Sequence, residues 1–267
     1  MRNSSANAEL RHNSWRLRIG VVVSAMRRTM LRSGLLIGTL LLVGNGPTEG
    51  FYARAAQPIW ERIAGAVGRP PLKLKSPDGA TTVSVRFVER KGEPAVTLQV
   101  AGRIGSGHVG IGPGVGSELL WAPDSRAFAV TTSDQGANGH FRTVVFARGA
   151  KGLRVRDLSP LIVRAFGHPV KCGWPEEPNV AALKWLAGSS RLIVVGEIVA
   201  HSNCDSFGTF RAYEVDWRSM RIVRNYDQLA AKKLFGTAMG IELRNAPDRC
   251  VRRPRSWVSI NHPGLVR

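Results

Sequence analysis

The feature that most restricts the fold of this chain is a unit that recurs three times between Leu72 and Asn225. Each copy has a short β-like run, a tight turn, a longer run rich in apolar and β-branched residues, a loop, and one or two further β-like runs. The copies begin with LKLKSPDGATTVSVRFVE, ELLWAPDSRAFAVTTS and ALKWLAGSSRLIVVGEIV. The predicted fold class is therefore all-β, with propeller-like four-stranded antiparallel units in a closed, incomplete or open arrangement and a short N-terminal helix.

The turn between the first two runs has a recognisable chemistry in copies one and two. Proline presets φ at the first central position of a type I turn, aspartate suits the second, and glycine or serine closes the turn. A tryptophan at the end of the preceding strand is expected to pack in the core. The predicted turn residues are Ser76, Pro77, Asp78, Gly79, Pro123, Asp124 and Ser125, and the two tryptophans are Trp121 and Trp185.

These turns resemble the blades of the TolB and WD40-like β-propeller family, which carry a serine-proline-aspartate-glycine turn preceded by an aromatic residue. The resemblance covers about residues 72–225. In the third copy, residues 185–190 lack the Pro-Asp pair and are expected to contain one extra residue. A closed propeller usually has four or more blades, so either residues 227–267 supply a degenerate blade or the sheets form an open or sandwich-like stack.

The N-terminal region has the pattern of an export signal. Seven arginines and one glutamate precede the apolar segment at residues 34–44, which is shorter than the ~20 residues of a membrane-spanning helix. Small residues follow, and we expect cleavage near Ala55 or Ala56. The alternative is an uncleaved inner-membrane anchor formed by residues 34–44. A translation start at Met26 would give a signal of more ordinary length and would leave residues 1–25 unmade. The arginine pair at residues 27–28 also resembles the twin-arginine export pattern.

Four segments follow from this pattern. They are residues 1–56, n-region and signal peptide or N-terminal anchor; residues 57–71, short helix and linker; residues 72–250, propeller-like β domain; and residues 251–267, basic C-terminal tail.

The chain is strongly basic, with 38 Lys and Arg against 19 Asp and Glu. Removing the first 56 residues takes away eight basic and two acidic residues, so 30 basic and 17 acidic residues leave a charge of +13. For an exported protein, this charge favours an acidic protein or an anionic envelope component as partner over nucleic acid. Association with a membrane surface is a further hypothesis, and a solvated basic surface without a partner is the alternative.

Two local patterns suggest chemistry. Gly105, Gly107 and Gly110 match G-x-G-x-x-G, but Pro113 and the strand expected after it leave no room for the helix that a dinucleotide site needs. The second pattern offers oxygen, nitrogen and sulfur donors that could bind zinc. It consists of Glu197, His201, Cys204 and Asp205.

Three cysteines allow one disulfide bond and one free thiol. Cys172 precedes the first strand of the third unit and Cys204 follows its second strand, so an antiparallel sheet would bring both to the same end. We predict a bond between Cys172 and Cys204. Pairings that include Cys250 are the alternatives.

The sequence predicts an exported, periplasmic or secreted protein that binds or scaffolds without catalysis. No cofactor and no metal are expected. The alternative is an exported hydrolase or metal-dependent enzyme built on Glu197, His201, Cys204 and Asp205.

Overall fold

The computed structural model describes residues 49–59, 71–90, 93–111, 116–133, 140–150, 152–167, 177–198 and 208–248. All of them belong to the compact unit formed by residues 47–267. Antiparallel strands dominate this unit and its helices are short, which confirms the prediction of an all-β, open propeller-like fold.

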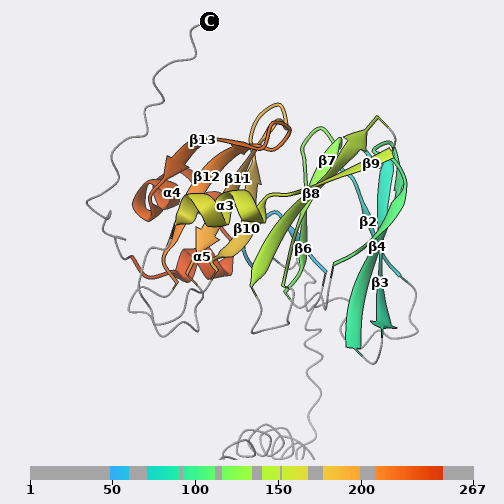
Figure 1. The fold of residues 1–267 in the computed structure, drawn as a ribbon, viewed down its shortest axis with the longest axis horizontal. Coiled ribbons are helices and arrows are strands. Elements are labelled where there is room, and N and C mark those ends of the chain that lie inside the picture. The colour runs from blue at the N-terminus through green and yellow to red at the C-terminus, as the bar shows by residue number, and fades with distance from the viewer. Residues whose placement is uncertain are drawn as a thin grey trace, which may run out of the picture. The chain divides into compact units, whose positions relative to one another are not determined.

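The strands form three consecutive antiparallel sheets (Figure 1). The first has the order β2-β3-β4-β5, the second β1-β6-β7-β8-β9, and the third β10-β11-β12-β13. The chain thus completes one sheet before it starts the next, apart from β1, which joins the second sheet from the N-terminal side. The strands are β1 (Gln57–Pro58), β2 (Leu72–Lys75), β3 (Thr81–Arg90), β4 (Glu93–Gly102), β5 (Gly107–Gly110), β6 (Glu118–Trp121), β7 (Ala127–Ser133), β8 (Phe141–Gly149), β9 (Gly152–Asp157), β10 (Asn179–Trp185), β11 (Arg191–Glu197), β12 (Phe210–Asp216) and β13 (Arg221–Tyr226).

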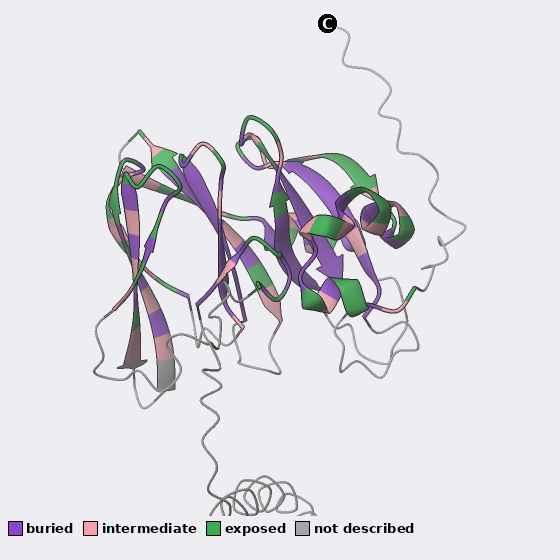
Figure 2. Cartoon of the chain, turned by 180° about the vertical axis from the view of Figure 1, so that it is seen from behind, coloured by how far each residue is buried: buried purple, intermediate pink, exposed green. Residues whose placement is uncertain are grey.

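The middle sheet is buried on both faces because successive side chains of a strand point to opposite sides. On β6, Leu119 packs with the first sheet and Leu120 with the third. On β7, Phe128 packs with the first sheet and Ala129 with the third. Figure 2 shows the resulting long buried stretches in the strands. The continuous apolar runs in β7 and β11 are therefore explained by sheets that are buried on both faces.

Short helices pack against the faces of the third sheet. Helix α3 (Ser159–Phe166) packs Ile162 and Phe166 into the core between the second and third sheets. Gly196 on β11 permits this close approach, since a Cβ there would press on both side chains. The outer face of the third sheet packs against α4 (Gln228–Phe235) and α5 (Ile241–Asn245), with the 3₁₀ turn η2 (Gly236–Ala238) between them.

These helices decide between the two expected arrangements of the sheets. In the described part of the chain, residues 227–248 form helices and not a degenerate blade, and three sheets form an open stack.

Among the described residues, no helix has the length and apolar character needed to cross a bilayer.

Several details differ from the sequence predictions. Gln57–Pro58 is a strand where a helix was expected, because its backbone pairs with β6. The third turn has no extra residue: Leu186 N donates to Arg191 O just as Ala122 N donates to Ala127 O. Helix α3 was not expected. The leader up to residue 48, residues 60–70 of the expected helix and linker, and the tail at 251–267 lie outside the described residues.

Candidate functional site

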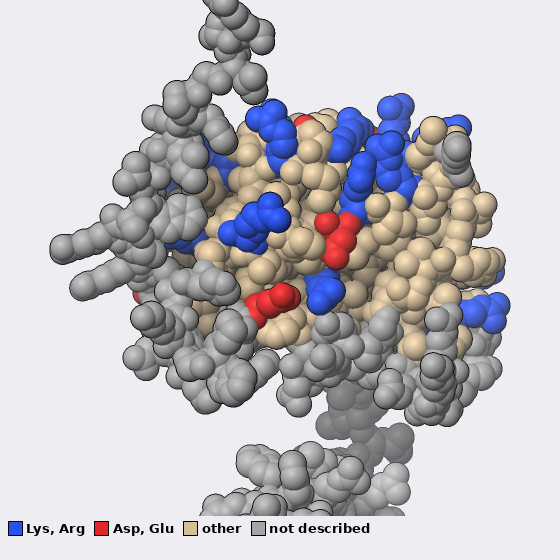
Figure 3. All heavy atoms as spheres, in the orientation of Figure 1, with Lys and Arg blue, Asp and Glu red and all other residues tan. Residues whose placement is uncertain are grey.

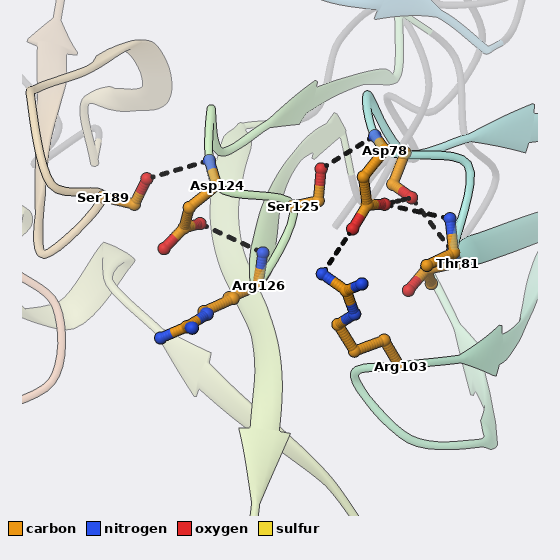
Figure 4. A network of polar contacts seen from close by, with 9 residues as sticks. Asp78, Thr81, Arg103, Asp124, Ser125, Arg126 and Ser189 are labelled. Carbon is orange, nitrogen blue, oxygen red and sulfur yellow. Dashed lines mark hydrogen bonds and ion pairs between the residues drawn. The ribbon is translucent and has the colours of Figure 1, made fainter.

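The turns that begin the three repeats are joined in a row by hydrogen bonds (Figure 4). The backbone N–H of Asp78 donates to Ser125 Oγ (3.1 Å), and that of Asp124 donates to Ser189 Oγ (3.3 Å). Both serines are buried and adopt left-handed backbone angles, with φ of 58° for Ser125 and 52° for Ser189. Each serine closes its own turn and also accepts from the preceding sheet's turn, so the three turn ends are held side by side.

The carboxylate of Asp78 stabilises its own turn. It accepts from the Ser76 hydroxyl (2.6 Å) and from Ala80 N (2.9 Å), and it forms an ion pair with Arg103 (2.6 Å). The Ser76 hydroxyl bond, followed by the Ala80 bond, lowers the pKa of Asp78. The aspartate of the turn motif therefore has a structural role at Asp78, and it orients Arg103.

A pocket of about 450 Å³ opens at this end of the sheets. Five arginines line it and come from all three sheets: one follows β4, one precedes β7, two lie on β8 and β9, and one follows β12. Figure 3 shows Lys and Arg side chains gathered over the upper part of the described surface. The lining residues are Arg103, Arg126, Arg148, Arg154 and Arg218, together with Ile104, Ala147 and Trp217.

The charge of this pocket is partly balanced within the protein, by the Asp78–Arg103 ion pair and by the electrostatic interaction of Asp216 with Arg218. Among the described residues, Arg103 forms an ion pair with Asp78, and the other four pocket arginines form none within 4.0 Å. Asp124 lies nearby, but its Oδ1 accepts the backbone N–H of Arg126 (3.0 Å). Several guanidinium groups around one cavity make a positive potential that attracts anions.

Trp217 gives the pocket a rigid wall. The side chain is 4% exposed, its Nε1 donates to Ser189 O (2.9 Å), and its ring meets that of Trp185 edge to face at 6.3 Å. The Arg218 guanidinium carbon lies 5.1 Å from the Trp217 ring centroid. The cation–π contact restricts this arginine, which also interacts electrostatically with Asp216.

A second polar cluster lies in the core, around Glu197. This residue ends β11 and is 0% exposed. Its Oε2 accepts from the Tyr52 hydroxyl (3.0 Å), which in turn accepts from Asn179 Nδ2 (3.0 Å). Burial raises the pKa of Glu197 to about 8, so the carboxyl is mostly protonated at neutral pH.

Of the group Glu197, His201, Cys204 and Asp205, the structure describes Glu197. Glu197 faces the core, whereas His201, Cys204 and Asp205 lie outside the described residues, as do Cys172 and Cys250. Across the described ranges, no three His, Cys, Asp or Glu side chains are placed to hold a metal ion. The glycine pattern lies in strand β5 and at the end of the turn before it, where Gly105 N donates to Gly102 O.

The sequence analysis missed the arginine pocket. Its residues are far apart along the chain, but each arginine lies at the same end of a strand as one of the repeat turns. That position within the repeat is the signal that could have identified it.

Comparisons with known proteins do not assign a family. No protein-family model matches the chain, and no curated protein matches its sequence. A weak structural match is an acylaminoacyl peptidase of Pyrococcus horikoshii in an orthorhombic crystal form, with 11% sequence identity and a TM-score of 0.35. The match covers 60% of this chain and 25% of that one, so it spans about a quarter of the peptidase. The likeness to TolB and WD40-like blades stays a resemblance in sequence and in the antiparallel sheets.

Proposed function

We propose that this domain is an exported binding protein and that its ligand is an anion held in the arginine pocket. The observation that carries the proposal is the convergence of five arginines from three sheets on one cavity, with a single ion pair among them in the described part of the chain. Export rests on the N-terminal signal pattern.

The side chains suit binding better than proton transfer. Arginine stays protonated at any physiological pH and has no lone pair to accept a proton. It binds phosphate, sulfate and carboxylate groups through paired N–H donors. A cavity of about 450 Å³ has the size of a small-molecule site. The supported ligand class is a phosphate-, sulfate- or carboxylate-bearing envelope component.

The surroundings of Glu197 do not suit a catalytic carboxylate. Its carboxyl is in the core, where Tyr52 and Asn179 occupy Oε2. A catalytic base has to reach a substrate, and this carboxyl contacts buried protein groups.

Isothermal titration calorimetry with inorganic pyrophosphate tests the proposal. The variant combines Arg148→Gln and Arg154→Gln, which removes two positive charges from adjacent strands. The control is Arg86→Gln, an exposed arginine on β3 outside the pocket. Charged hydrogen bonds contribute roughly 1.5–3 kcal/mol each, so affinity should fall at least tenfold in the double variant and stay within twofold in the control.

Salt provides a second measurement. Raising NaCl from 50 to 300 mM should weaken binding to the native protein more than to the double variant, because screening acts on the charges that were removed. Equal affinities of the native protein and the double variant would overturn the proposal.

A further inference from the structure

Residues 49–59, named here the N-terminal clasp, are built into the domain although they follow directly on the leader pattern. The first contacts involve Glu118, at the start of β6. This side chain is 2% exposed, and its two oxygens accept the backbone N–H groups of Tyr52 (3.2 Å) and Ala53 (3.1 Å). A buried carboxyl group needs such partners, and the clasp supplies both.

Tyr52 extends this attachment to the third sheet. The side chain is 1% exposed, and its hydroxyl lies between Glu197 and Asn179, at 3.0 Å from each. Its ring packs edge to face on Phe141 of β8 at 5.1 Å. One tyrosine thus contacts residues of the second and third sheets and satisfies buried polar atoms of β10 and β11.

The backbone of the clasp is also paired with the C-terminal helices. Ala53 forms a β-bridge with Met239. Arg54 N donates to Ala238 O (2.8 Å), and Tyr52 O accepts from Gly240 N (2.7 Å). A Cβ on Gly240 would overlap the backbone carbonyls of Gly50 and Phe51, so the two segments approach as closely as glycine permits.

A further pair of contacts closes the clasp at its ends. Gln57–Pro58 adds a strand to β6, and Ile59 N donates to Ser117 O (2.8 Å). At the other end, Glu49 forms an ion pair with Arg244 of α5. The segment is therefore attached along its whole length.

We infer that the N-terminal clasp remains part of the folded domain after export, so that any processing of the leader leaves Glu49 and the residues after it in place. A cut at Ala55 or Ala56 would remove Tyr52 and Ala53. It would leave Glu118, Glu197 and Asn179 buried without these partners, and buried polar groups in folded proteins are nearly always hydrogen-bonded. The boundary expected from the small residues at 53–56 conflicts with this packing.

The first experiment maps the N-terminus. The full chain with a C-terminal affinity tag is expressed in a bacterium and recovered separately from periplasmic and membrane fractions without denaturant. Intact mass and N-terminal sequencing should show that protease-resistant protein in either fraction begins at Glu49 or earlier. Folded protein that begins at Ala56 or Gln57 would overturn the inference. Retention of residues 34–44 in the membrane fraction supports it and also identifies an anchor.

The second experiment tests whether the domain depends on the clasp. Tyr52→Ala is compared with Phe51→Ala, a neighbouring aromatic residue that is 37% exposed. Digestion of the domain by thermolysin should be at least tenfold faster in Tyr52→Ala than in Phe51→Ala. Tyr52→Phe keeps the ring and removes only the hydroxyl, so an intermediate rate is expected, and it provides a folded sample if the alanine variant is not recovered. Equal rates in all three variants would contradict the inference.

Discussion

Replacing Glu118 by glutamine should change how the stability of the domain depends on pH. Burial raises the pKa of Glu118 to about 8, although the N–H groups of Tyr52 and Ala53 act in the opposite direction. In the unfolded chain, the pKa of a glutamate is about 4.3. Between these values the folded state keeps a proton that the unfolded state loses.

The sign of the effect follows from this difference. A raised pKa in the folded state contributes stability that is fully present below about pH 4.3 and is lost as pH rises toward 8. One carboxyl group changes the free energy of unfolding by about 1.4 kcal/mol per pH unit within that window. The pKa of Glu197 is raised to about 8 as well, so the native protein should show up to twice this slope.

Glu118→Gln removes the contribution of Glu118 to the pH dependence of the free energy of unfolding and leaves that of Glu197. Its amide nitrogen cannot accept, so one of the two N–H groups, Tyr52 or Ala53, loses its partner at a cost of about 1–3 kcal/mol. The variant should therefore be less stable than the native protein near pH 5. It should become the more stable of the two by about pH 8, because the native protein loses about 1.4 kcal/mol more for each unit of pH.

Urea unfolding followed by tryptophan fluorescence at pH 5, 6, 7 and 8, at constant ionic strength, measures both curves. Glu177→Gln changes an exposed carboxylate and is the control, which should parallel the native protein. Parallel curves for the native protein and Glu118→Gln across this range would refute the reasoning, since they would mean that Glu118 does not titrate between the two pKa values.

Two further substitutions test the packing by unfolding measurements. Gly240→Ala places a Cβ against the backbone of Gly50 and should destabilise the domain by about 1–3 kcal/mol, whereas Gly236→Ala meets no atom within 4 Å and should be neutral or stabilising by up to about 1 kcal/mol. Equal effects would show that the approach at Gly240 is not tight. Ser125→Ala removes the acceptor of Asp78 N and keeps the left-handed backbone angle, so it should cost about 1–2 kcal/mol; Ser125→Gly relieves that angle and should be about 1 kcal/mol more stable than the alanine variant. A less stable glycine variant would show that the angle carries no strain.

The local pattern of the sequence was enough to predict many of the strands and turns of the fold. Alternation and turn chemistry were enough to place Trp121 and Trp185 at the ends of β6 and β10. They also placed the Pro-Asp turns between the first two strands of the repeats that form the first and second sheets, because hydrogen bonds between near neighbours form these turns. The third turn was harder to align, since Ala187 and Gly188 replace the Pro-Asp pair while the backbone hydrogen bonds are the same.

The repeats thus determined the strands within each of the three units and their antiparallel order, but not β1, because the units depend on interactions within short stretches of chain whereas β1 joins β6 from a distant segment. Tertiary structure alone decided that residues 227–248 cover the third sheet as helices, that Tyr52 reaches Glu197 across 145 positions, and that arginines from three sheets share one pocket. Such contacts depend on which faces meet after the sheets stack. No periodic pattern along the chain records that pairing, because side chains brought together from distant segments have no fixed spacing in sequence.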